Sequence, residues 1–121
     1  MPSTTMPVLA ANLSRRLCLI ALACAGLGVR TPRAQTPPIK LVMRNKQWDP
    51  TELTVPANEK FELHITNADA VAIEFESHDM RREKVIAPGE TVVVFIGPLR
   101  PGTYNFLNDF NKAARGRIIA K

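Results

Sequence analysis

The sequence predicts an all-β protein, a single-domain β-sandwich of seven to eight short strands. In residues 39–121 apolar and polar side chains alternate with a period of two, which is the pattern of strands with one buried face. Turn-forming pairs such as Pro88-Gly89 and Pro101-Gly102 separate these runs at intervals typical of sandwiches and barrels. No window has the period of a long amphipathic helix, and only residues 109–115 are expected to form a helical turn.

The strands are expected where the alternation is strongest. The clearest run is 60–66, in which Phe61, Leu63 and Ile65 point to one side and polar residues to the other. The continuous apolar run at 91–96 is typical of a strand in the middle of a sandwich. The remaining expected strands are 39–44, 52–55, 71–76, 84–86, 103–107 and 117–120.

Residues 1–34 have the plan of a signal peptide. They contain four of the sixteen basic residues and none of the eleven acidic ones, and their apolar run at 17–29 is too short to cross a bilayer. This pattern predicts export, by the general secretory route rather than the twin-arginine route, with cleavage near Ala34. Residues 35–38 are then a stiff, proline-containing linker, and residues 39–121 are the mature domain.

The composition of the mature part excludes several classes of function. Its charges nearly balance, so the pI of 9.7 belongs to the leader and does not indicate nucleic-acid binding. The only cysteines, Cys18 and Cys24, lie in the leader, so the domain has no thiolate nucleophile and no cysteine metal ligand. The sequence has no serine nucleophile elbow, phosphate loop or zinc-protease motif. It therefore does not predict an enzyme that acts by itself.

Three segments of the mature part occur in the order and spacing of a known family. They are Leu53-Thr54-Val55-Pro56-Ala57, then Asn67-Ala68-Asp69 after an alternating strand, then Pro101-Gly102-Thr103-Tyr104-Asn105-Phe106 with a closing strand after Gly116. On these segments residues 39–121 resemble the cupredoxins, and the resemblance implies a Greek-key β-sandwich. It also implies where blue-copper ligands would stand, namely at Ile73, Asn108, Asn111 and Ala114. None of these is a usual copper ligand, so a type 1 copper centre is not expected.

A narrower resemblance rests on Glu74-Phe75-Glu76-Ser77-His78, Arg82-Glu83-Lys84-Val85-Ile86 and Phe95-Ile96-Gly97-Pro98-Leu99. These segments are similar to the cupredoxin-like domains that accompany bacterial high-affinity iron permeases. The resemblance implies a periplasmic protein that binds copper or iron, or oxidises ferrous iron, with an iron permease and a periplasmic iron-binding protein as partners. The sequence departs from that family at Asp109-Phe110-Asn111, where an acid-Phe-His triplet is usual.

The candidate metal ligands are Glu74, Glu76, His78 and Asp109. In an extended strand Glu74, Glu76 and His78 share one face, and neighbouring negative charges there would be relieved by a bound cation. Two carboxylates and an imidazole suit iron, Cu(II) or Mn(II) better than Cu(I). Asp109 lies in the loop that carries ligands in the wider fold, and approaches from the other side.

Other interpretations of these residues stay open. The same pattern is typical of a half-exposed strand, and a cation from Arg81 to Lys84 would neutralise Glu74 or Glu76 without any metal. His64 is expected to be a surface residue and Met43 a core residue. Three functions follow: a metal-binding accessory of iron uptake, a metal-free module that docks on a permease or a periplasmic partner, and, more weakly, a ferroxidase.

Overall fold

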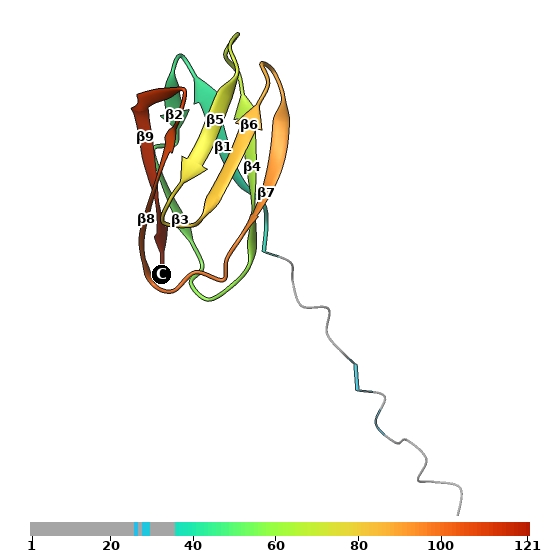
Figure 1. Ribbon diagram of the computed structural model, residues 1–121. Coiled ribbons are helices and arrows are strands. Elements are labelled where there is room, and N and C mark those ends of the chain that lie inside the picture. The colour runs from blue at the N-terminus through green and yellow to red at the C-terminus, as the bar shows by residue number, and fades with distance from the viewer. Residues whose placement is uncertain (1–25, 27, 30–35) are drawn as a thin grey trace, which may run out of the picture. The chain divides into compact units, whose positions relative to one another are not determined.

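The computed structural model describes residues 26, 28–29 and 36–121, and residues 36–121 form two β-sheets packed face to face (Figure 1). The first sheet has the strand order β2 (Gln47–Asp49), β1 (Ile39–Arg44), β4 (Phe61–Asn67), β7 (Thr91–Ile96). The second has the order β3 (Glu52–Val55), β9 (Asn111–Ala120), β8 (Gly102–Asn108), β5 (Ile73–Ser77), β6 (Arg82–Ile86). The β-sandwich predicted from the alternation is confirmed, and β2 brings the number of strands to nine.

The core lies between the sheets and is built from the inward side chains of both. Residues of β4 and β7 alternate between buried and outward positions, as strands with one covered face do. The largest aromatic side chains meet at one place: the Trp48 ring stands edge-on to Phe75 and Phe106, with ring centroids 6.0 and 5.6 Å away. Phe75 and Phe106 are 5.3 Å apart. These rings lie directly beneath β5 and β8, and therefore beneath the candidate site.

Two expectations about single elements are wrong. Residues 109–115 form no helical turn, because Asp109 and Phe110 make a tight turn between β8 and β9 and the chain continues as a strand. The apolar run of β7 is an edge strand rather than a central one. It pairs only with β4, and its outward side chains Val93 and Phe95 are 42% and 67% exposed.

The predicted signal peptide at 1–34 falls almost entirely outside the described residues and stays a prediction, as does the boundary at the linker. Within the residues that the structure describes, no helix is long and apolar enough to cross a membrane. The site discussed below lies wholly within residues 36–121.

Candidate functional site

Strand β5 presents two of the candidate ligands on the outer face of the five-stranded sheet. Ile73, Phe75 and Ser77 are buried, whereas Glu74 and Glu76 are half-buried on the opposite side. The alternation expected for this segment is therefore observed, and it follows from the covering of one strand face by the aromatic core. His78 comes directly after the strand and its side chain is 85% exposed.

The side chain of Asn108 ties the turn that carries Asp109 to β5. Its buried Oδ1 atom accepts hydrogen bonds from the backbone N–H of Glu74, at 2.9 Å, and of Phe110, at 3.2 Å. The backbone N–H of Asp109 donates to the carbonyl oxygen of Glu74 at 2.9 Å. The two bonds to Glu74 join the turn to β5 and place Asp109 beside this strand, and the bond to Phe110 closes the turn.

Glu76 is the centre of the resulting cluster. Its carboxyl group lies close enough to that of Asp109 for the two to interact, and its Oε1 atom lies 3.2 Å from Nε2 of His78. Burial raises the pKa of Glu76, the Asp109 hydrogen bond and negative charge raise it further, the charge of Glu74 adds to this, and only His78 lowers it. Negative charge therefore gathers around Glu76 on this face, and a bound cation would relieve it.

Glu83 belongs to the same face and was missed by the sequence analysis. In the antiparallel pairing of β5 with β6, Glu83 stands directly opposite Glu76. The signal that would have found it is the four-residue connection between β5 and β6, which fixes the register of this hairpin. Like charges in such a pair repel, which strengthens the case for a cation at this face.

The basic stretch beside Glu83 does not neutralise these acids. The Arg82 side chain donates to the carbonyl oxygens of Phe95, at 3.1 Å, and Arg81, at 3.0 Å. Among residues 36–121, no lysine or arginine forms an ion pair with Glu74 or Glu76, so the structure does not favour the alternative in which a cation of this stretch neutralises them. The cation nearest the cluster is Lys112, whose Nζ atom lies 3.5 Å from Asp109 Oδ1.

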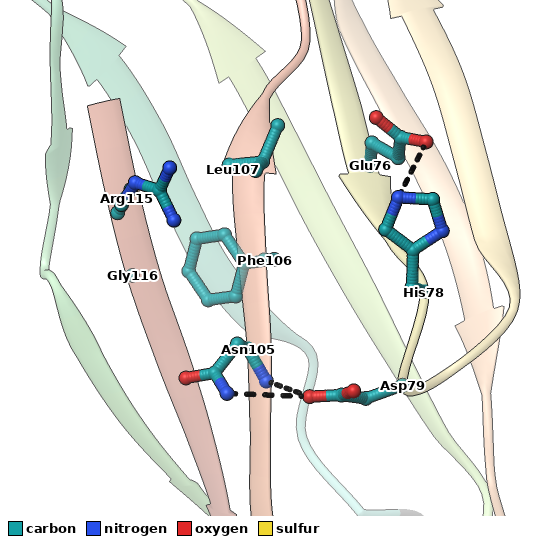
Figure 2. A pocket seen from close by; sticks show the side chains of 8 residues that line it. All are labelled: Glu76, His78, Asp79, Asn105, Phe106, Leu107, Arg115 and Gly116. Carbon is teal, nitrogen blue, oxygen red and sulfur yellow. Dashed lines mark hydrogen bonds and ion pairs between the residues drawn. The ribbon is translucent and has the colours of Figure 1, made fainter. Parts of the chain in front are cut away.

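An open pocket of about 230 Å³ adjoins the cluster on the outer face of the sheet (Figure 2). Glu76 and His78 border it on one side and Arg115 of β9 on the other, with Phe106 and Leu107 of β8 between them. Below them, Asp79 accepts hydrogen bonds from the backbone N–H of Asn105, at 2.8 Å, and from its side-chain amide, at 3.3 Å. The pocket thus has an acidic border and a basic border.

The side chains of the cluster do not form a complete set of metal ligands in this arrangement. Within the described part of the chain, no three or more histidine, cysteine or acidic side chains are arranged to hold a metal ion. Glu76, His78 and Asp109 are brought together, whereas Glu74 acts on Glu76 only through its charge. Binding would require His78 to rotate, and an exposed side chain can do this at little cost in packing.

The other residues singled out from the sequence have structural positions. Met43 is fully buried in the core, as expected, and Met80 is also buried there. His64 is half-buried rather than fully exposed, with Nε2 at 2.9 Å from Oε2 of Glu62. Neither methionine is near an exposed surface where it would serve as a soft metal ligand.

Comparison with known families shows to which family this chain belongs. A model of the cupredoxin-like domain matches residues 17–120. The chain belongs to the cupredoxin-like domain family. An uncharacterized protein of Rickettsia prowazekii (strain Madrid E) is 39% identical over 82 residues, which cover 67% of this chain and 66% of that protein. The chain thus matches just under two thirds of that relative's length.

Solved structures with the same fold include copper proteins. Auracyanin A, a "blue" copper protein of Chloroflexus aurantiacus, has a TM-score of 0.60 at 16% identity, over 70% of this chain and 98% of that one. Amicyanin of Paracoccus versutus has a TM-score of 0.57 at 13% identity, over 72% of this chain and 84% of that one. At this identity the likeness supports a shared cupredoxin-like sandwich.

The four blue-copper positions of this cupredoxin-like domain do not fit a type 1 centre. Ile73 and Ala114 are buried and carry no donor atom, and the buried Asn108 already uses its Oδ1 atom to hold the turn. The connection between β8 and β9, where Asn111 begins the last strand, is only two residues long. The indole N–H of Trp48 donates to the carbonyl oxygen of Ala114 at 3.2 Å, which fixes this end of β9 against the aromatic core.

Proposed function

We propose that the mature domain is a periplasmic cupredoxin-like protein that binds an iron or copper ion as an accessory of iron uptake, at Glu76, His78, Asp109 and Glu74. The observation that carries this proposal is the carboxyl group of Glu76, which lies beside a second carboxyl and an imidazole and, among residues 36–121, forms no ion pair with a lysine or arginine. The resemblance to the domains that accompany iron permeases is the basis for iron and for the role in iron uptake, and the cupredoxin-like family supports copper.

The chemistry of the cluster favours a borderline or hard cation. Carboxylate and imidazole donors suit Fe(III), Fe(II) and Cu(II), whereas Cu(I) prefers sulfur ligands. A divalent or trivalent ion would offset the repulsion that Glu76 experiences from Asp109 and Glu74, and from Glu83 on the opposite strand. His78 supplies a neutral donor on an exposed side chain that can turn toward the ion.

Titration of the mature domain with Fe(II), Fe(III) and Cu(II), followed by calorimetry, tests this function. We expect binding of at least one of these ions well below millimolar concentration, and Glu76→Gln or His78→Ala should each weaken it about tenfold or more, since even indirect partners of a metal contribute this much. Glu62→Gln is the matched control, because Glu62 forms the same Glu-x-His pair with His64 but has no second carboxyl beside it. Millimolar or weaker binding of all three ions would exclude the proposal.

Stability against pH shows whether Glu76→Gln still folds around an intact cluster. The folded-state pKa of Glu76 is raised, so its contribution to stability is fully present below the unfolded pKa and is lost as pH rises through the folded pKa. The Glu76→Gln variant has no carboxyl group at this position that becomes charged as pH rises. It should be at least as stable as the wild type at pH 7, with the difference vanishing below about pH 4. Lost metal binding in a variant that unfolds more easily would point to misfolding instead.

A metal-free interaction module is a second candidate, favoured by the outward side chains of β7. Phe95 and Val93 are exposed on an edge strand, where large apolar groups commonly mark a protein contact. Under this proposal the domain docks on an iron permease or its periplasmic partner. The complex should then persist in chelator and in Glu76→Gln, and be lost in Phe95→Ser, with the exposed Val71→Ser as control. A complex that chelator dissociates would exclude this candidate.

A further inference from the structure

Strand β7 is the one sheet edge in residues 36–121 whose own residues do nothing to keep a further strand away. Edge strands are commonly protected by being short, by charged side chains or by proline. Of the other three edges, β2 has three residues, β3 has four, and β6 carries Arg82, Glu83 and Lys84. β7 has six residues without charge or proline, and it lies at the margin of the sandwich (Figure 1).

Alternate residues of β7 direct their backbone groups away from β4. The carbonyl oxygen of Glu90, just before β7, accepts the N–H of Asn67 at the end of β4, at 2.9 Å. Because the backbone groups of an antiparallel strand alternate in direction, the even-numbered residues of β7 pair with β4 and the odd-numbered ones face the free edge. These odd-numbered residues are Thr91, Val93 and Phe95. An added strand would find their N–H and C=O groups in the spacing of a sheet ladder.

The outer side of this edge is an apolar strip that ends in a hollow. Val93 and Phe95 are its exposed side chains. An open hollow of about 320 Å³ adjoins Phe95, and its other lining residues are Thr36, Pro38, Lys60, Phe61 and Glu62. Side chains of paired strands contact one another on each face of a sheet, so apolar outward side chains of an added strand would pack against this strip.

The inner side of the same edge carries positive charge from β6. In the pairing of β6 with β5, Arg82 stands opposite the buried Ser77 and Lys84 opposite the buried Phe75. Both cations therefore lie on the inward side of β6, and the Arg82 side chain reaches β7, where it donates to the carbonyl oxygen of Phe95 at 3.1 Å. Within residues 36–121 neither cation forms an ion pair with an acid. The inward side chains of an added strand would lie beside these two charges.

These features favour one kind of occupant over a second copy of the chain. Pairing of β7 with its own copy about a two-fold axis would bring two sets of Arg82 and Lys84 toward each other, and like charges across an interface repel. A strand with acidic inward side chains and apolar outward ones would satisfy the backbone groups, the apolar strip and the cations together. In strand addition the main chain supplies affinity and the alternating side chains supply specificity.

We propose that β7 is a docking site for an extended segment of a partner protein in which acidic and apolar side chains alternate. This inference rests on the second candidate function, the interaction module, and adds to it the chemistry of the partner. It does not depend on metal binding. Six residues make a small interface compared with the about 20–30 a side of a stable complex, so the isolated segment should bind weakly and reversibly.

Fluorescence anisotropy of labelled synthetic peptides with the mature domain, at low ionic strength, tests the proposal. The probes are a peptide of alternating valine and glutamate, one of alternating valine and lysine, and one with the composition of the first but with valine and glutamate in successive pairs. We expect the first to bind about tenfold more tightly than the others, because the second brings like charges to Arg82 and Lys84 and the third lacks alternation.

Lys84→Gln should weaken binding of the alternating valine–glutamate peptide about threefold or more and reduce its dependence on salt, since one attractive charge is removed. Lys46→Gln is the matched control. It removes the same charge at the turn between β1 and β2, at the other edge of the four-stranded sheet, and should leave the affinity unchanged.

Hydrogen exchange locates the bound peptide. The amides of the odd-numbered residues 91, 93 and 95 should exchange more slowly in the complex, whereas those of residues 92, 94 and 96, which already face β4, should not change. Equal affinity for the glutamate and lysine peptides, or slowing at another strand, would overturn the inference. A domain that sediments as a dimer with these amides protected before peptide is added would also overturn it, in favour of a second copy. The complex in chelator remains the separate test of the second candidate function.

Discussion

Replacing Gly116 with alanine is expected to destabilise the domain by about 1–3 kcal/mol, the usual cost of overpacking a core. A Cβ atom at this position would lie 2.6 Å from Cε2 of Phe106 and 2.9 Å from the carbonyl oxygen of Thr51. Neither neighbour can retreat easily. The Phe106 ring is buried against Trp48 and Phe75, and the Thr51 carbonyl accepts the N–H of Arg117 at 2.9 Å. Because glycine has no side chain, the ring of Phe106 on β8 can lie over the backbone of Gly116, its partner on β9.

Urea denaturation monitored by tryptophan fluorescence measures this effect. Gly102→Ala is the control on the paired strand, where the nearest atom to a new Cβ would be 3.8 Å away and no loss beyond about 1 kcal/mol is expected. Adding Phe106→Leu to Gly116→Ala should cost less than the sum of the two single changes, because the smaller side chain makes room for the Cβ atom. Additive costs, or an alanine variant as stable as wild type, would contradict the proposed clash.

Periodicity alone predicts most of the sandwich, and the strand it misses has a specific cause. Strand β2 follows a two-residue turn at Asn45 and Lys46, both with positive φ, of 54° and 60°. Such turns usually carry glycine, so the sequence shows no turn signal here. The conformation is held instead from a distant loop, where the carboxylate of Asp69 accepts the N–H groups of Asn45, at 2.7 Å, and Lys46, at 2.8 Å.

The position of β7 in its sheet could not be read from its own residues. A run of Val and Phe indicates a strand, but it does not distinguish two buried faces from one buried face with exposed apolar groups on the other. Val92, Val94 and Ile96 do face the core, whereas Phe95 faces outward on an edge. Position within a sheet depends on pairing partners that are far away in the sequence, and here β4 is the only one.

Only part of the candidate site could be predicted from the sequence, because the rest depends on which strands pair with one another. Alternation places Glu74 and Glu76 on one face without any tertiary information. The place of Glu83 opposite Glu76 required the register of the β5–β6 hairpin. The helical turn expected at 109–115 does not form, because the N–H of Phe110 donates to the side chain of Asn108 and the N–H of Asp109 donates to the carbonyl oxygen of Glu74.

Asn108→Ala is expected to have the second large effect, about 2–5 kcal/mol, and to act on both stability and metal binding. It leaves the N–H groups of Glu74 and Phe110, which make part-buried hydrogen bonds, without their acceptor, and a fully buried donor left unsatisfied costs about 1–3 kcal/mol. The turn that carries Asp109 would then lose one hydrogen bond to β5 and one that closes the turn itself. Because Asp109 meets Glu76 only through this turn, the metal site should weaken even in molecules that remain folded.

The two effects are separable by experiment. Thermal unfolding of the metal-free domain reports the loss of the hydrogen bonds, and metal titration well below the melting temperature reports the position of Asp109. Asn105→Ala is the control for stability, since Asn105 lies on the same strand but is exposed and its amide makes a single hydrogen bond of 3.3 Å, to Asp79. It should cost less than about 1 kcal/mol. If Asn108→Ala lowers the melting temperature while metal affinity is unchanged, Asp109 is not a ligand and the site consists of the β5 residues and His78 alone.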